Sequence, residues 1–182
     1  AQYGGFGILD EVNMAKNDAV SVLHATLDYR RSIDVPGYDK IMLHPAARFI
    51  GTMNYGYAGT KELNEALVSR FMVIDMPAQN HDTLQKVFHD FFPDGKEDAM
   101  EQLIGLFLDL QLKAQNGEIS TKALDLRGML AAVKTIRCGL SPALAVRMGI
   151  VNKSFDAFEK EIIDDVVMTR IPEDWTEADI FA

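Results

Sequence analysis

The chain has 182 residues, of which 48% are hydrophobic and 25% charged, and this composition is typical of a globular protein with one domain or two small ones. Its net charge of −9 argues against a broad phosphate-binding surface, so a direct nucleic-acid partner is not expected. No apolar run reaches the roughly 18 to 20 residues of a membrane span, and the single cysteine, Cys138, fits a reducing compartment, so we expect a cytoplasmic protein without a membrane partner.

A strand, a helix and a hairpin are predicted in the first part of the chain. Residues 5–10 form a brief apolar run that begins with glycine and ends in polar residues, which favours a buried strand. Asn17 or Asp18 can cap a following helix that runs to about Tyr29, because apolar residues recur there at spacings of three and four. A Pro-Gly turn between two short extended segments then predicts a hairpin within residues 30–45.

Two further strands are predicted before the composition changes. The stretch "ARFIGTMN" indicates a second buried strand that ends at Asn54, and the glycine-rich "YGYAGT" indicates a loop. A short helix, "KELNEALVSR", then precedes a third strand, "FMVIDM", over residues 71–76, which Pro77 closes. The first 78 residues therefore predict an α/β fold.

Only helical patterns follow from His81 onward. Ser120 and Ser141 stand where helix N-caps are expected, and Gly117 and Gly139 mark helix ends. The expected helices cover residues 81–92, 97–115, 120–137, 141–152 and 155–170. We therefore predict a boundary near residue 78, with an α/β part over residues 1–78 and an all-helical part over residues 79–182.

Polar residues follow the first two predicted strands at their carboxyl ends. Asp10 and Glu11 come directly after the first strand, and Asn54 ends the second. The carboxyl edge of an open α/β sheet is where ligands bind. A carboxylate in a dry site costs several kcal/mol unless a cation or another partner lies beside it. The acidic pair therefore predicts a ligand or a partner at this edge.

Three stretches of this α/β part resemble the AAA+ ATPases, and within them the MoxR and dynein-related branch. "GILDEVNMA" resembles the Walker B strand, "FIGTMN" the sensor 1 strand, and "ELNEALVSRF" the helix that carries the arginine finger. The resemblance implies a fold class: residues 1–78 would be the C-terminal part of a P-loop AAA+ core, from Walker B to strand 5, with a parallel sheet and helices. Residues 79–182 would be its all-α lid.

The resemblance also implies roles for individual residues. Asp10 would hold the Mg²⁺ of bound ATP through water, and Glu11 would orient or deprotonate the attacking water. Asn54 would be sensor 1, which holds the water or contacts the γ-phosphate. Arg70 would be the arginine finger, which reaches the phosphate of a neighbouring subunit and so implies a homo-oligomer, in this family a hexameric ring.

The lid is expected to supply one more basic residue, called sensor 2. The stretch "STKALDLRGML" resembles the lid helix that brings this residue to the nucleotide, and it offers Lys122 and Arg127. The resemblance favours Lys122, since the family usually has an arginine directly after Ser-Thr or Ser-Pro. Lysine contacts phosphate as a point charge and lacks the bidentate geometry of arginine.

The phosphate-binding loop of the family is missing from the sequence. The pattern G-x-x-x-x-G-K-[ST] does not occur, and its backbone amides and lysine are what cradle the phosphates. We therefore expect a chain that is truncated before its Walker B strand and is inactive alone. Loss of the family's first two strands would leave a vacant position between the strands at 48–53 and 71–76.

The function implied by the resemblance is ATP hydrolysis that drives remodelling or maturation of a client protein. A partner with a von Willebrand factor A domain is common in the MoxR branch. The alternative is a nucleotide-independent interaction module derived from a degenerate AAA+ half. A DNA-loading AAA+ protein is a third hypothesis, which the acidic net charge disfavours.

Simpler interpretations of the same residues remain open. The acidic pair could be the favoured start of a helix, where the helix dipole stabilises carboxylates. Asn54 could be a turn residue, because asparagine tolerates left-handed geometry. Arg70 could form a surface ion pair with Glu62 or Glu65 on its own helix, which contributes little to stability.

Overall fold

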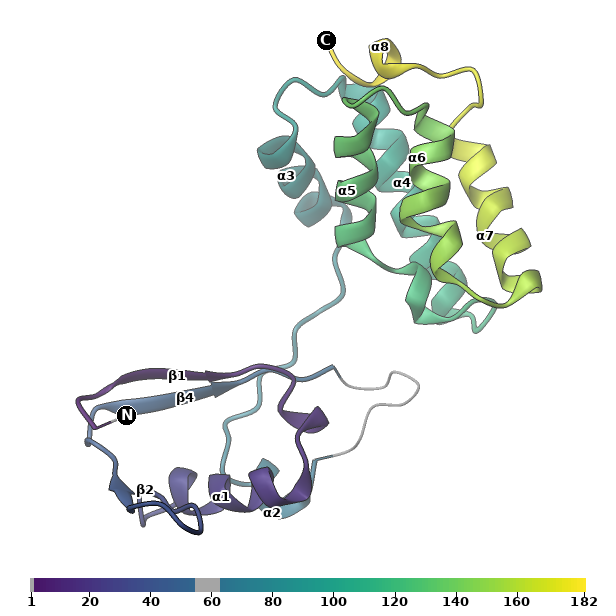
Figure 1. Ribbon diagram of the computed structural model, residues 1–182. Helices are drawn as coiled ribbons and strands as arrows, with labels where there is room; N and C mark the ends of the chain where they lie inside the picture. The colour runs from purple at the N-terminus through teal and green to yellow at the C-terminus, as the bar shows by residue number, and fades with distance from the viewer. Residues whose placement is uncertain (1, 55–62) are drawn as a thin grey trace. The chain divides into compact units, whose positions relative to one another are not determined.

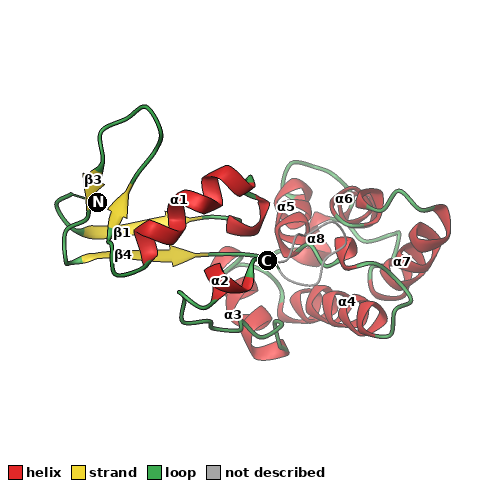
Figure 2. Ribbon diagram, turned by 90° about the horizontal axis from the view of Figure 1, so that it is seen from below, coloured by secondary structure: helices red, strands yellow, loops and turns green. Residues whose placement is uncertain are grey.

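The computed structural model describes residues 2–54 and 63–182 of the chain. The chain forms two compact units, Ala1–Met76 (unit 1) and Pro77–Ala182 (unit 2), which are described separately (Figure 1). Within the described residues, unit 1 contains both sheets, and unit 2 is built from helices (Figure 2).

Unit 1 is organised around two parallel strands, as the apolar runs predicted. Strand β1 (Gly5–Leu9) pairs with β4 (Ala47–Gly51), in a register that sets Gly5 beside Ala47 and Leu9 beside Gly51. The hairpin prediction is also confirmed, because β2 (Ser32–Ile33) and β3 (Ile41–Met42) pair antiparallel. The other elements of unit 1 are the 3-10 helix η1 (Val12–Met14), α1 (Asn17–Leu27) and α2 (Glu65–Val68).

The predicted cap of the first helix is shifted by one residue. Lys16 occupies the N-cap position of α1, and Asn17 is already the first helical residue. The helix ends at Leu27, two residues before the predicted end, and Asp28 follows in an extended conformation. A short helix can tolerate such a cap, because its stability comes mainly from packing of its apolar face.

Helices cover only one face of the strand pair within the described part of unit 1. Both α1 and α2 lie on the same side of β1 and β4 (Figures 1 and 2). The opposite face carries large apolar side chains that remain exposed: Phe6 at 76%, Ile8 at 71% and Ile50 at 50%. Parallel sheets are normally covered on both faces, so this surface is unusually apolar for one that contacts solvent.

The prediction of a third strand over residues 71–76 is wrong for this structure. These residues have no strand conformation, and Met72, Val73, Ile74 and Met76 are exposed. An apolar run becomes a strand only when a neighbour satisfies its backbone N–H and C=O groups. The described residues provide no such neighbour, since the sheet of β1 and β4 is two-stranded.

Unit 2 encloses the larger apolar interior. Its longer helices are α3 (His81–Phe91), α4 (Glu97–Gln115), α5 (Leu126–Ile136), α6 (Pro142–Gly149) and α7 (Ala157–Arg170). Shorter elements connect and close them: η2 (Thr121–Ala123), η3 (Val151–Lys153) and α8 (Glu177–Ile180). Leu84, Phe88, Leu103, Phe107 and Ile163 are among the fully buried residues at its centre, where each contributes roughly 1.5–3 kcal/mol of burial free energy.

Local signals explain where several helices of unit 2 begin and end. Asn80, Asp125 and Asp156 cap α3, α5 and α7 with their side-chain oxygens. Ser141 occupies the predicted N-cap position of α6, but its side chain makes no capping hydrogen bond. Gly117 follows α4 with φ of 76°, a left-handed conformation that glycine adopts without strain.

The helix predicted over residues 120–137 is interrupted near its start. Residues 121–123 form η2, and α5 begins only at Leu126. Asp125 causes the break, because its side chain accepts a hydrogen bond from the N–H of Gly128 at 3.0 Å and so caps a new helix. No helix in the described part of the chain is long and apolar enough to cross a membrane.

Candidate functional site

The carboxyl ends of β1 and β4 bring the predicted acidic pair beside residues 52–54. The pairing of the two strands continues past their last residues: Thr52 N–H donates to the carbonyl of Leu9, and Val12 N–H donates to the carbonyl of Thr52, both at 2.9 Å. This register places Asp10 and Glu11 next to Thr52, although 41 and 42 residues separate them in sequence. The structure thus confirms a cluster of polar groups at this sheet edge.

The hydroxyl of Thr52 links the two acidic residues. It donates a hydrogen bond to Oδ1 of Asp10 and accepts one from the backbone N–H of Glu11 at 3.2 Å. One hydroxyl therefore holds the Asp10 side chain and the Glu11 backbone together. The sequence analysis did not identify Thr52, although a hydroxyl residue directly after an apolar strand was a usable signal.

Glu11 has an unusual backbone conformation, with φ of 50° and ψ of 45°. Residues with a Cβ rarely adopt this left-handed region, and the strain costs on the order of 1–3 kcal/mol. β1 ends at Leu9 and η1 begins at Val12, so Asp10 and Glu11 form the turn between the two elements. Glu11 is the N-cap residue of η1, which spans only Val12–Met14, and its side chain makes no capping hydrogen bond, so the interpretation of the acidic pair as a helix start stays an alternative.

Asn13 connects η1 to the predicted sensor residue. Its side-chain Nδ2 donates to the backbone carbonyl of Asn54 at 3.2 Å. Asn13 is 5% exposed, and its Oδ1 has no hydrogen-bond partner among the described residues. A buried acceptor without a partner is costly, so it indicates a place for a donor beside this cluster. Asn54 is exposed, and the loop after it lies outside the described residues.

Arg70 lies in the same unit and contacts a carboxylate that the sequence analysis did not single out. Its Nη2 is 3.8 Å from Oδ2 of Asp28, and its Nη1 donates to the carbonyl of Ala66. The partner is therefore Asp28 and not Glu65, the alternative proposed on its own helix; Glu62 lies outside the described residues. The Nε of Arg70 is buried without a partner among those residues.

Asp28 is the most strongly perturbed carboxyl in unit 1. Its side chain accepts hydrogen bonds from Nε and Nη2 of Arg30, which lower its pKa to about 2. Burial acts in the opposite direction, and the charge of Arg70 lowers the pKa further. Asp28 thus stays ionised at any physiological pH and offers Arg70 a permanent negative charge.

The two predicted sensor 2 candidates lie in unit 2, one just before α5 and one in its first turn. Lys122 belongs to η2, and Arg127 is the second residue of α5; both side chains are exposed. Glu159 holds Ser120, which precedes η2, because its side chain accepts hydrogen bonds from the N–H of Ser120 and the hydroxyl of Ser154. Burial raises the pKa of Glu159, but these bonds and the charge of Lys122 outweigh it and leave the pKa lowered.

The donor set of unit 1 fits a magnesium ion bound through water. Hard cations prefer oxygen ligands, and Mg²⁺ usually keeps several waters and takes one or two carboxylates. Asp10 offers one carboxylate oxygen that Thr52 does not occupy. No three metal-ligating side chains gather at one point of the described residues. The described residues therefore do not surround a metal ion with protein ligands alone. A site with one carboxylate and several waters does not require three such side chains.

The comparisons with known proteins support the resemblance seen in the sequence. Residues 1–71 match the family described as "AAA domain (dynein-related subfamily)". The uncharacterized protein YojN of Bacillus subtilis (strain 168) is 32% identical over 167 residues, which cover 91% of this chain and 55% of that protein. An uncharacterized protein of Staphylococcus aureus (strain NCTC 8325 / PS 47) is 33% identical over 162 residues, 87% of this chain and 60% of that protein.

This chain therefore spans little more than half the length of these curated relatives. The matched family residues include β1, β4, Asp10, Glu11, Thr52, Asn54 and Arg70. They contain the strand pair and the polar cluster at its carboxyl edge, where ligands bind in open α/β sheets. Residues 1–71 of this chain are thus similar to AAA domains of the dynein-related subfamily.

Proposed function

We propose that this chain contributes the hydrolytic carboxylates of an ATPase site. The observation that carries the proposal is the contact of Thr52 with both acidic residues, which joins the ends of β1 and β4 into one polar cluster. The family match over residues 1–71 supports it independently. The sequence contains no phosphate-binding loop, so ATP binding requires residues that this chain does not supply.

Each residue of the cluster has a different proposed role. Asp10 would hold Mg²⁺ through water, with its carboxylate oriented by the hydroxyl of Thr52. Glu11, which is exposed, would accept a proton from the attacking water. Asn54 would hold that water without adding charge. Bound MgATP supplies the γ-phosphoryl group and the charge that neutralises it.

Arg70 is proposed to act on a neighbouring subunit, and Lys122 or Arg127 on the nucleotide of its own subunit. A guanidinium can stabilise the charge that develops during phosphoryl transfer. In this structure Arg70 lies beside Asp28, so reaching a neighbour's phosphate would require it to leave that contact. Such an arginine functions only in an oligomer, and we propose a ring.

We further propose a MoxR-like protein that couples hydrolysis to remodelling or maturation of a client protein, with or without a von Willebrand factor A domain partner. The β2–β3 hairpin, in the stretch between the acidic pair and Asn54, is a candidate for the contact with the client. The second candidate function is a nucleotide-independent interaction module, for which the exposed apolar face of β1 and β4, with Phe6, Ile8 and Ile50, offers a contact surface.

The test is magnesium-dependent ATP turnover by the longest natural form of the protein. Glu11→Gln should lower kcat by a factor of about 10² or more, because general-base catalysis contributes 10²–10⁴. ATP binding should remain, since the amide keeps the shape of the side chain. Asp165→Asn makes the same carboxylate-to-amide change on an exposed position of α7 and should leave kcat unchanged.

Turnover that survives Glu11→Gln would contradict the assignment of the base. A natural form that binds no nucleotide and hydrolyses none would contradict the ATPase proposal and support the interaction module. The two results are distinguished by measuring nucleotide binding separately, with a fluorescent ATP analogue.

A further inference from the structure

Asn13 is a buried polar residue at the carboxyl edge of β1 and β4, and the function proposed above gives it no role. It is the second residue of η1, two positions after Glu11, and it is 5% exposed. A buried polar side chain costs free energy unless hydrogen bonds compensate for the water that it loses. The contacts of this amide therefore need an explanation.

Asn13 supplies a donor where the strand ladder of β1 and β4 runs past the ends of both strands. The carbonyl of Thr52 accepts from the backbone N–H of Val12 at 2.9 Å. In a regular parallel pair, the carbonyl two residues further along would accept from the backbone of the same neighbouring strand. The chain has already turned into η1 after Glu11, and the side-chain Nδ2 of Asn13 donates to the carbonyl of Asn54 at 3.2 Å instead.

This hydrogen bond holds the backbone of Asn54. Among the described residues it is the only hydrogen bond that reaches Asn54, whose side chain is exposed. The other end of the link is short, because only Val12 separates Asn13 from Glu11. One side chain thus sets the separation between the turn that carries the proposed base and the residue proposed to hold the attacking water. A displacement of about 1 Å in such a geometry can lower a rate about 10²-fold.

The other end of the Asn13 amide makes stability alone a poor explanation for this residue. Its Oδ1 is buried and has no hydrogen-bond partner among the described residues. An acceptor in that state costs free energy, and an apolar side chain of similar size would avoid the cost. An amide is a suitable choice where a neutral donor must reach Asn54, because it adds no charge beside Asp10 and Glu11.

We propose that Asn13 is a positioning residue of the hydrolytic site, whose Nδ2 holds Asn54 at a fixed distance from Glu11. This role rests on the ATPase function proposed above. Asn13 acts through Asn54 and not on the nucleotide itself. Its removal should therefore impair the chemical step and leave nucleotide binding almost unchanged.

The test is magnesium-dependent ATP turnover by the longest natural form of the protein. Asn13→Ala should lower kcat about 10- to 100-fold, as loss of a supporting hydrogen bond typically does, and should change KM less than about twofold. Asn13→Asp keeps the shape of the side chain but replaces the donor with an acceptor, so it should be at least as impaired.

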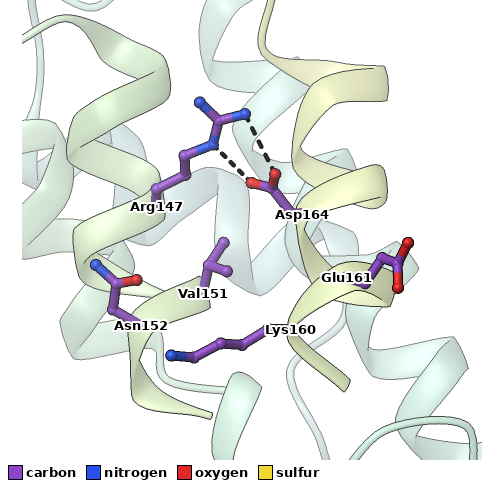
Figure 3. A pocket seen from close by; sticks show the side chains of 6 residues that line it. All are labelled: Arg147, Val151, Asn152, Lys160, Glu161 and Asp164. Atoms are coloured by element: carbon purple, nitrogen blue, oxygen red, sulfur yellow. Dashed lines mark hydrogen bonds and ion pairs between the residues drawn. The ribbon is translucent and has the colours of Figure 1, made fainter. Parts of the chain in front are cut away.

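Asn152→Ala is the matched control. Asn152 is likewise the second residue of a three-residue 3-10 helix, η3, where it follows a buried valine. It is exposed and lies at a hollow in unit 2, with its amide in view beside Lys160 (Figure 3). The proposed site does not include it, so its replacement should leave kcat unchanged.

A double-mutant cycle separates positioning from a general structural effect. In an Asn54→Ala background, Asn13→Ala should lower kcat by less than about twofold further, because the residue that it positions has lost its amide. An equal loss of kcat in both backgrounds, or an unchanged kcat in Asn13→Ala alone, would overturn the proposal. Thermal unfolding of each variant identifies loss of fold, and Asn13→Ser replaces an alanine variant that fails to fold.

Glu11→Gln is measured in the same assay to keep the two proposals apart. If Glu11→Gln abolishes turnover and Asn13→Ala leaves it unchanged, the role of Asn13 fails and the ATPase proposal stands. Turnover that survives Glu11→Gln would overturn the assignment of the base and the role of Asn13 with it.

Discussion

At the level of single residues, Thr52 has the largest influence on the candidate site. Its hydroxyl is the only group among the described residues that bonds to both Asp10 and Glu11. Glu11 keeps a left-handed conformation that its Cβ disfavours, so the bond to its N–H helps to hold a strained residue in place. Thr52 is thus a positioning residue for both carboxylates.

Replacing Thr52 by valine, which has nearly the same shape, should destabilise unit 1 by about 1 kcal/mol, because one hydroxyl and its two hydrogen bonds are lost. In the longest natural form, kcat for ATP should fall while KM changes little, since the carboxylates lose orientation. Urea unfolding of the chain and ATP turnover measure the two effects.

Thr52→Ser keeps the hydroxyl and should restore kcat. If the serine variant is as impaired as the valine variant, the hydroxyl is not the cause.

The acid sensitivity of α1 should depend on Asp28. Its pKa is lowered to about 2 in the folded chain, below the value of about 4 in an unfolded one. The ionised Asp28 side chain therefore contributes its full stabilisation of the folded state above about pH 4, and this stabilisation is lost as the pH falls toward 2. Asp28→Asn should speed amide exchange in α1 at pH 6 and have little effect near pH 2.

Mass spectrometry of amide exchange measures this difference, with comparison of variant and parent at each pH. Asp34→Asn is the control, since this exposed carboxyl lies on the hairpin, 3.9 Å from Lys40. An equal effect of Asp28→Asn at both pH values would contradict the role assigned to the ionised carboxylate.

At the level of elements, the carboxylate of Asp125 joins the start of α5 to η3. Asp125 caps α5 and also binds Nζ of Lys153 in η3. These hydrogen bonds and the lysine's charge outweigh burial, which acts in the opposite direction, and leave the pKa of Asp125 lowered. A second contact lies nearby, where α5 and α6 approach at Gly128 and Gly149 too closely for a Cβ on either residue. The segment that carries Lys122 and Arg127 is therefore firmly held.

Asp125→Ala should destabilise unit 2 by about 1–2 kcal/mol, because it removes a helix cap and leaves Lys153 without its partner. Asp125→Ser restores the cap without the charge and should recover about half of that loss or more. Urea unfolding monitored by the fluorescence of Trp175, which packs against the core of unit 2, measures both values. If alanine and serine were equally destabilising, capping would not be the main contribution.

At the level of the whole molecule, the two units differ in how much apolar surface they enclose. The described part of unit 1 buries few apolar side chains, namely Val12, Leu43, Ala47 and Leu67, and leaves one sheet face exposed. Unit 2 has a continuous interior with contributions from α3 to α8. Since stability follows buried apolar area, unit 1 should be the less stable of the two.

The chain should therefore unfold in two steps. Far-ultraviolet circular dichroism reports on both units, whereas the single tryptophan, Trp175, reports on unit 2. We expect the dichroism signal to begin its loss at a lower urea concentration than the fluorescence change. Thermolysin should cut first within residues 72–76, which are exposed and belong to no helix or strand, and release an intact unit 2. Coincident transitions would show a single cooperative unit.

The sequence by itself determined the elements whose signals are local. The strands β1 and β4 and the hairpin follow from apolar runs and a Pro-Gly turn, and the five longer helices of unit 2 follow from periodicity. Their ends followed less well, since α5 begins only at Leu126 and α6 ends at Gly149. The meeting of Asp10 and Glu11 with the end of β4 also followed, because parallel strands bring their carboxyl ends to one edge. The roles of Asp10, Glu11, Asn54, Arg70, Lys122 and Arg127 remain predictions, since they depend on a bound nucleotide.

Only the tertiary structure decided the contacts between distant residues. Residues 71–76 have the composition of a strand, but a strand exists only beside a partner that accepts its hydrogen bonds. The hydrogen bond of Thr52 to Asp10 and the ion pair of Arg70 with Asp28 each join residues that are 42 positions apart in the sequence, so no local sequence pattern predicts them. Side-chain conformations and strand pairing are settled by the packing of the whole unit, which is why these features could not be predicted from the sequence.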